Sequence, residues 1–214
     1  MNNENSTGIQ HLPAFRIATL AILIAVTTLF TYIIRIPVAP TRGYINFGDV
    51  SIFFTAMIFG PITALITGGT GTALADLISG YSQWAPFTFL AHGLQGLAIG
   101  LVIKAGRHIS SGAGRRISSA GKDAAGPAQS PAQASAHNGG IHKPGIFTLL
   151  AAFLAGTVVM AGIYFLTGGL MVGFAAAAAE IPGNILQNVA GVLVGTPLAL
   201  AVWKAYPPIR FYTW

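Results

Sequence analysis

Several long stretches of this chain contain no aspartate, glutamate, lysine or arginine, and they constrain the fold more than any other feature. The longest runs from Pro144 to Ala179, and another runs from Ile17 to Ile34. A helix of about 20 apolar residues crosses the roughly 30 Å hydrocarbon core of a bilayer. Only 7% of the residues are charged and 53% are hydrophobic, against about 25% and roughly 45–50% in soluble domains. The sequence therefore predicts an all-α integral membrane protein that spans the lipid bilayer as a single domain.

Proline and glycine divide the apolar sequence into six expected transmembrane helices. Pro13 suits a first helical turn, Gly60-Pro61 forms a tight turn, and Gly168-Gly169 offers a break in the longest run. The stretch between that break and Glu180 is too short to cross, so we expect an interfacial or re-entrant piece there. The expected helices span residues 13–34, 47–59, 61–79, 87–103, 145–167 and 182–204.

Two segments lack the apolar character of these helices. Residues 35–46 contain Pro37, Pro40 and Gly43, so we expect a loop and not a continued helix. Residues 105–143 are rich in serine, glycine, alanine and proline, with interspersed basic residues. Such a composition cannot bury enough apolar area to fold. We expect this segment to be a disordered cytoplasmic linker that separates two parts of one bundle.

The basic residues predict the orientation of the helices. Six helices place both termini on one side, and lysine and arginine are enriched in cytoplasmic loops. With both termini cytoplasmic, only Arg35 and Arg42 lie outside. The other nine are Arg16, Lys104, Arg107, Arg115, Arg116, Lys122, Lys143, Lys204 and Arg210. Orientation in a prokaryotic plasma membrane thus explains the net charge of +6, and no basic helical face indicates a nucleic acid partner.

Several classes of chemistry are excluded by missing residues. The chain has no cysteine, so disulfides, thiolate metal sites and cysteine nucleophiles cannot form. The glycines of Gly68–Gly71 lack the Gly-Lys-Ser/Thr ending that a phosphate-binding loop needs. No histidine and carboxylate spacing is typical of a metal site. We therefore expect no metal, no cofactor and no catalytic residue.

Three acids are expected at the outer ends of different helices: Asp49, Asp76 and Glu180. A carboxylate at membrane depth costs about 3 kcal/mol on insertion scales, so it normally faces a partner, water or a ligand. A structural pair between Arg42 and one of the aspartates is one interpretation. A ligand site is the preferred one, because further hydrogen-bonding groups and an aromatic ring reach the same level. These are Arg42, Asn46, Trp84 and Asn184.

Other polar residues lie deeper in the expected bundle. Thr88, His92 and Gln95 are spaced so that they share one face of a helix. Gln187 and Asn188 lie below Asn184 on the last helix. His92 is either a packing residue or a ligand contact, and the two amides are either interhelical hydrogen bonds or ligand contacts.

A stripe of small residues follows the first expected helix. Ala14, Ala18, Ala21 and Ala25 recur at steps of four, three and four residues. Such stripes let another helix approach closely in lipid. The alternative is a chance spacing, because alanine is common in membrane helices.

Six segments together carry a family resemblance. They are YINFGD (44–49), FGP (59–61), ALADLISGY (73–81), WAPFTF (84–89), HGLQGLAIG (92–100) and EIPGNILQ (180–187). The set resembles the substrate-binding S components of energy-coupling factor (ECF) vitamin transporters, in the riboflavin-type and hydroxymethylpyrimidine-type branch.

The resemblance implies a six-helix, non-enzymatic subunit that captures a water-soluble vitamin or precursor at its outer face. The ligand would be hydroxymethylpyrimidine or another thiamine precursor, pyridoxine or riboflavin. The implied partners are a transmembrane coupling subunit and two ABC ATPases. Ala21 and Ala25 match the family's docking patch, and Ala14 and Ala18 repeat it. The substrate contacts carried over are Asp49, Trp84, His92, Glu180, Asn184 and Gln187.

Two alternatives stay open beside this interpretation. A stand-alone facilitator or channel would need no ATPase. A membrane hydrolase would use Asp49 and Asp76, although Asn46 stands where intramembrane aspartyl proteases carry glycine. Neither alternative accounts for the segment from Glu180 to Gln187.

Overall fold

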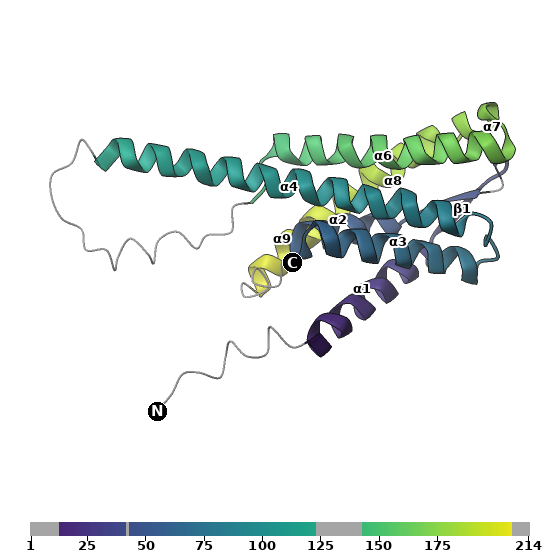
Figure 1. Ribbon diagram of the computed structural model, residues 1–214, viewed down its shortest axis with the longest axis horizontal. Helices are drawn as coiled ribbons and strands as arrows, with labels where there is room; N and C mark the ends of the chain where they lie inside the picture. The colour runs from purple at the N-terminus through teal and green to yellow at the C-terminus, as the bar shows by residue number, and fades with distance from the viewer. Residues whose placement is uncertain (1–12, 42, 123–142, 207–214) are drawn as a thin grey trace.

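The computed structural model describes residues 13–41, 43–122 and 143–206, and Figure 1 shows them as a bundle of helices with a two-stranded hairpin at one end. Five helical stretches are long and apolar enough to cross a membrane, and a sixth apolar helix, Gly48–Phe59, is shorter. The predicted all-α membrane fold of six helices is thereby confirmed. The start of α1 and the end of α9 lie at the same end of the bundle, opposite the hairpin (Figure 1). The elements are α1 (Pro13–Ile33), β1 (Arg35–Val38), β2 (Gly43–Asn46), α2 (Gly48–Phe59), α3 (Pro61–Ile78), α4 (Ala85–Lys122), α6 (Ile146–Val172), α7 (Phe174–Ala178), α8 (Ile181–Ala190), the π-helical turn η2 (Gly191–Gly195) and α9 (Thr196–Ala205).

Glycines let α3 pack closely against both of its neighbours. A Cβ atom on Gly69 would lie 2.8 Å from the carbonyl oxygen of Phe89 in α4, and one on Gly71 would lie 2.6 Å from the Thr27 side chain in α1. From the α4 side, a Cβ atom on Gly96 would lie 2.7 Å from the Ala64 carbonyl oxygen. The glycines of this helix therefore serve close helix packing, as their small size predicts.

The short helix α2 lies at the centre of the bundle. Every residue of it except Phe54 is buried. Its C-terminal part joins the main apolar core, which includes Phe53, Met57, Ile99 and Trp203. A helix that is apolar on all sides needs neighbours all round, and α1, α3, α4, α8, η2 and α9 all contact α2.

The segment expected to be a loop forms a hairpin instead. Strands β1 and β2 pair antiparallel, with Arg35 opposite Asn46 and Val38 opposite Gly43. Pro37 pairs with Tyr44, and a proline is tolerated there because each strand of a two-stranded sheet has a free edge. The prolines that exclude a helix from this segment are therefore compatible with a short strand.

Helix α4 continues to Lys122, so its expected end at residue 103 was wrong. Residues 105–122 belong to the helix and not to a disordered linker. No proline occurs between Pro86 and Pro127, and extending an existing helix avoids the cost of nucleation. The rest of the expected linker, 123–142, lies outside the described residues, and its cytoplasmic location stays a prediction.

The break expected at Gly168-Gly169 occurs instead at Gly173, which has a φ of 97°. A residue with a side chain rarely adopts this left-handed conformation. Gly168 and Gly169 remain helical and face α7, because Cβ atoms there would lie 3.2 Å from Ala177 and 2.3 Å from the Phe174 ring. The short helix α7 thus folds back onto the end of α6.

The last expected helix is one continuous helical path with a π-helical turn in its middle. In this turn, Gly191 and Gly195 face α2. A Cβ atom on Gly191 would lie 3.0 Å from the Asp49 carbonyl oxygen, and one on Gly195 would lie 2.6 Å from that of Val50. The absence of side chains at these two positions lets the turn lie directly against α2.

Candidate binding site

A pocket lies at the hairpin end of the bundle, between β2, α3, α4, α6 and α8. Its cavity volume is about 30 Å³, which is room for about two water molecules. An organic ligand would therefore have to widen the pocket. The lining residues are Gly43, Tyr44, Asn46, Asp76, Trp84, Thr88, Tyr164, Glu180, Asn184 and Gln187.

Most of the site residues expected from the sequence line this pocket. Asp49 and His92 do not line it, and Arg42 lies outside the described residues. Gly43, Tyr44 and Tyr164 line it although the sequence did not single them out. The expected residues that line it are Asn46, Asp76, Trp84, Thr88, Glu180, Asn184 and Gln187.

The Asp76 carboxylate lies near the end of α3 and is 2% exposed. Its Oδ1 atom accepts a hydrogen bond of 2.6 Å from the Tyr44 hydroxyl, whereas its Oδ2 atom has no hydrogen-bond partner among the described residues. Thr88 lies near the same carboxylate, without the geometry of a hydrogen bond to Oδ2. Burial, and then the negative charge of Asp76, raises the pKa of the Tyr44 hydroxyl. Tyr44 therefore stays protonated and donates to the carboxylate.

The second carboxylate of the pocket, Glu180, joins the hairpin to the opposite side of the bundle. Glu180 lies between α7 and α8, and its Oε1 atom accepts a hydrogen bond from the Thr41 hydroxyl at the hairpin tip. Gly43 makes this approach possible, because a Cβ atom there would lie 2.7 Å from the same Oε1 atom. Residues 139 positions apart in the sequence are thus joined at the pocket rim.

Three amide side chains form the part of the wall between the hairpin and α8. The Gln187 Oε1 atom accepts a 2.8 Å hydrogen bond from the backbone N–H of Asn46, and Gln187 Nε2 donates to Asn184 Oδ1 at 3.2 Å. The Asn46 side chain accepts a 2.8 Å hydrogen bond from the N–H of Gly48 at the start of α2. The Nδ2 group of Asn184 is buried and has no hydrogen-bond partner in the part of the chain that the structure describes.

Aromatic rings complete the wall. The Trp84 and Tyr164 rings lie 6.4 Å apart between centroids and are tilted by 58°. The Tyr164 hydroxyl donates a 2.9 Å hydrogen bond to Thr88. A buried tyrosine hydroxyl usually has a hydrogen-bond partner. The presence of a tyrosine in the longest uncharged stretch was therefore the sequence feature that could have identified Tyr164 as a site residue. The wall therefore offers aromatic surface from two different segments of the chain to a ligand.

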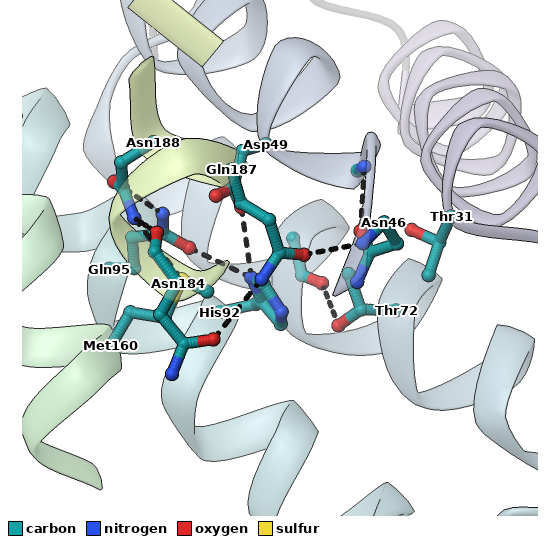
Figure 2. Close-up of polar contacts among 12 residues, drawn as sticks. Thr31, Asn46, Asp49, Thr72, His92, Gln95, Met160, Asn184, Gln187 and Asn188 are labelled. Carbon is teal, nitrogen blue, oxygen red and sulfur yellow. Dashed lines mark hydrogen bonds and ion pairs between the residues drawn. The ribbon is translucent and has the colours of Figure 1, made fainter. Parts of the chain in front are cut away.

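Beside the pocket lies a fully buried polar layer, which Figure 2 shows. The His92 Nδ1 atom lies 3.1 Å from Asp49 Oδ1 and 2.8 Å from Gln95 Oε1. The Gln95 Nε2 group donates to Asn188 Oδ1 at 2.9 Å, and Asn188 donates to the Asn184 carbonyl oxygen at 3.1 Å. Asp49, His92, Gln95 and Asn188 are all 0% exposed. These side chains connect α2, α4 and α8, and we call them the buried polar layer.

The length of α2 explains why Asp49 belongs to this layer and not to the pocket. Helices α2 and α3 share the turn at Gly60 and have 12 and 18 residues. At about 1.5 Å per residue, the outer end of α2 lies roughly 9 Å deeper than that of α3. Asp49 therefore contacts His92 within the bundle, and only Asp76 reaches the pocket.

Comparison with known proteins identifies the family of this chain. The family model for the ECF-type riboflavin transporter S component matches residues 13–118 and 133–204. The chain belongs to this family. The unmatched residues 119–132 fall within the segment expected to be a linker.

Two relatives cover most of the chain. A protein of Pyrococcus woesei, described as an uncharacterized protein in the gap 3′ region, is 31% identical over 182 residues, which are 85% of this chain and 97% of the relative. The thiamine precursor transporter HmpT of Lactococcus lactis subsp. cremoris is 26% identical over 185 residues, which are 86% of this chain and 85% of the relative.

Family membership decides the general class of this protein. It is a vitamin-binding subunit of a transporter, a multi-pass membrane protein that works with membrane ECF components. It is not an enzyme, so the hydrolase alternative is wrong. Among the described residues, no group of three or more histidine, aspartate and glutamate side chains could hold a metal ion.

Proposed function

We propose that this protein captures a water-soluble vitamin or vitamin precursor at the extracellular face of the cell membrane. The candidates are hydroxymethylpyrimidine or another thiamine precursor, pyridoxine and riboflavin. The bound ligand is delivered to the cytoplasm together with a transmembrane coupling subunit and two ABC ATPases. The observation that carries this proposal is the pocket at the hairpin end, where two carboxylates, three amides and three aromatic rings gather around one cavity.

The distribution of basic residues supports the proposed orientation. Lys204 is in the last turn of α9, whose end lies opposite the hairpin (Figure 1), and the Arg107 guanidinium of α4 stacks on the Trp203 ring of α9 at 4.9 Å from its centroid. Since lysine and arginine are enriched on the cytoplasmic side, we assign that end to the cytoplasm. The pocket then opens to the outside, and both termini are cytoplasmic.

The alanine stripe supports a docking face on α1. Ala14, Ala18, Ala21 and Ala25 are all exposed, and only 17% of the most apolar window of α1 is buried within the bundle. A stripe of small residues that no described helix of this chain covers leaves room for a helix of another subunit. We assign this stripe to the coupling subunit.

The first test is ligand binding by the purified protein. Mass spectrometry of the small molecule that co-purifies identifies the vitamin, and calorimetry with that compound gives its affinity. We expect Trp84→Ala and Asn184→Ala to weaken binding by about tenfold or more, because they remove an aromatic wall and a hydrogen-bond donor. Unchanged affinity in both variants would show that the ligand binds elsewhere in the protein.

A second test separates binding from transport. Ala21→Trp should abolish uptake by cells that contain the coupling subunit and ATPases, while the purified variant still binds ligand. Ala151→Trp, at an exposed alanine on α6, is the matched control and should leave uptake intact. Uptake that persists in cells without a coupling subunit would favour a stand-alone facilitator.

A further inference from the structure

The pocket contains two buried polar atoms that no group of the described residues satisfies. The Oδ2 atom of Asp76 is an acceptor without a donor, and the Nδ2 group of Asn184 is a donor without an acceptor. Their side chains are 2% and 5% exposed, and both residues line the same cavity. Buried groups left unpaired are costly, so these two atoms indicate the hydrogen bonds that a ligand completes.

The neighbouring groups are already used by the protein itself. Tyr44 occupies the other oxygen of Asp76, and Thr41 occupies Oε1 of Glu180. Gln187 donates to the Asn184 side-chain oxygen. Among the fully buried atoms of the described lining, the ligand is therefore left with one carboxylate oxygen that needs an N–H or O–H donor, and one amide N–H that needs an acceptor.

The charge of the pocket further restricts the class of ligand that can bind. The described lining residues include the carboxylates Asp76 and Glu180 and no lysine, arginine or histidine. Arg35 of β1 stacks on the rings of Tyr32 and Tyr44, at 4.5 and 5.8 Å from their centroids, and is not a lining residue. A negatively charged ligand would meet two like charges in a medium of low dielectric constant, where repulsion is strong.

The shape of the pocket favours a single ring. Trp84, Tyr44 and Tyr164 line it, and aromatic walls favour a flat ligand. The cavity of about 30 Å³ must widen for any vitamin, and it must widen least for one six-membered ring. A fused three-ring system requires a much larger displacement of the same side chains.

We propose that the site selects a single-ring, uncharged or cationic aminoheterocycle, whose amino group donates to Asp76 and whose ring nitrogen accepts from Asn184. An aminopyrimidine combines these features in one flat ring. This inference rests on the proposed function and specifies its ligand. Asp76 thereby recognises the amino group by accepting its hydrogen bond, and the carboxylates of Asp76 and Glu180 disfavour the binding of anionic analogues.

Three pyrimidines that differ by one group test the proposal. The first is 4-amino-5-hydroxymethyl-2-methylpyrimidine, the second lacks the amino group, and the third carries a carboxylate in place of the hydroxymethyl group. Calorimetry with the purified full chain should show the second binding about 10- to 100-fold more weakly, the loss of one hydrogen bond to a charged group. The carboxylate should bind at least as weakly as the second compound. Riboflavin should bind more weakly than the first.

Variants connect these preferences to particular side chains. Asp76→Asn should weaken binding of the first compound and reduce its advantage over the carboxylate by about tenfold, because one negative charge is removed. Asp123→Asn, the same change at an acid of the expected linker, should change neither value. Glu180→Gln should reduce the advantage by a smaller factor, with Glu4→Gln as its control. Because the comparison of compounds on the unmodified protein needs no variant, a variant that fails to fold does not prevent the test.

The outcomes distinguish this inference from the proposed function. If riboflavin or the carboxylate binds as tightly as the aminopyrimidine, the inference is overturned while vitamin binding stands. An Asp76→Asn variant that folds and keeps the full preference for the amino compound also overturns it. If none of the pyrimidines, pyridoxine, thiamine or riboflavin binds, the proposed function fails with it.

Discussion

The pocket wall and the buried polar layer contain the same kinds of side chain and differ in whether those side chains border a cavity. In the buried polar layer, the Nδ1 atom of His92 faces both Asp49 and Gln95, and Gln95 and Asn188 continue the chain. Asp49 Oδ2 and His92 Nε2 have no hydrogen-bond partner among the described residues, but neither residue lines the pocket. In the pocket wall, Asp76 and Asn184 each keep one polar atom unpaired at the cavity itself. An unpaired polar atom inside a membrane bundle therefore indicates a ligand contact only where it also borders a cavity.

The largest expected effect comes from breaking the pair of Asp49 and His92. His92→Leu leaves the Asp49 carboxylate buried without its partner, and such a loss costs about 3–5 kcal/mol of folding free energy. Thermal unfolding in detergent should show a strongly lowered midpoint, whereas the folded fraction keeps its ligand affinity within about threefold.

A double variant sharpens this first prediction. Asp49→Leu combined with His92→Leu replaces the pair by apolar side chains and should recover much of the lost stability, since buried ion pairs are often replaceable in this way. If the single variant loses affinity without losing stability, His92 is a ligand contact and the division between the two regions is wrong.

The next effect compares two asparagines one turn apart on α8. Asn184→Ala removes the unpaired pocket donor and should weaken ligand binding by about tenfold with little change in unfolding midpoint. Asn188→Ala removes hydrogen bonds to Gln95 and to the Asn184 carbonyl oxygen, and should lower the midpoint with less than a threefold change in affinity. Calorimetry and thermal unfolding of both variants measure this contrast, and equal effects of the two substitutions on affinity would contradict it.

A smaller effect is expected at the rim of the pocket. Gly43→Ala introduces a methyl group 2.7 Å from Glu180 Oε1, so the carboxylate must move and its hydrogen bond to Thr41 weakens. Because the end of a glutamate side chain is flexible, we expect only a two- to fivefold faster ligand dissociation, an effect of about 0.4–1 kcal/mol, measured by stopped-flow fluorescence. Gly145→Ala, where a Cβ atom meets nothing within 4 Å, should leave the rate unchanged.

The smallest effect is expected for Tyr164→Phe. The hydroxyl of Tyr164 donates a single hydrogen bond to Thr88, and such bonds in membrane proteins contribute about 0.6 kcal/mol on average. The unfolding midpoint should fall slightly, and ligand affinity should stay within about twofold because the ring remains in the wall. A large loss of affinity would show that the hydroxyl itself contacts the ligand.

The sequence was sufficient for the parts of the fold that depend on apolar length and local breaks. Six helices, the turn at Gly60 and most of the pocket residues follow from apolar runs and from polar residues near helix ends. The sequence was not sufficient to predict how deep in the bundle each helix end lies. A linear pattern does not show that α2 begins deeper than the end of α3. For this reason the sequence pattern grouped Asp49 with Asp76.

Other differences have equally local causes. The helix break could not be assigned from glycine alone, since Gly168 and Gly169 are required by contacts with Ala177 and Phe174 that form only in three dimensions. Tyr164 was missed because a single hydroxyl barely changes the hydropathy of its helix. Distant partners, and not local propensity, decide these positions.

The π-helical turn at Gly191–Gly195 sets the angular phase of the last membrane crossing. A π-helical turn contains about one residue more than an α-helical turn, and each residue advances a helix by about 100°. The side chains of Asn184, Gln187 and Asn188 face inward before the turn, as do Ala199 and Trp203 after it. Removing one residue between Gly191 and Gly195 would convert the turn to an ordinary α-helical turn and keep both sets facing the bundle, whereas removing one residue elsewhere between Asn188 and Ala199 would rotate one set by about 100°.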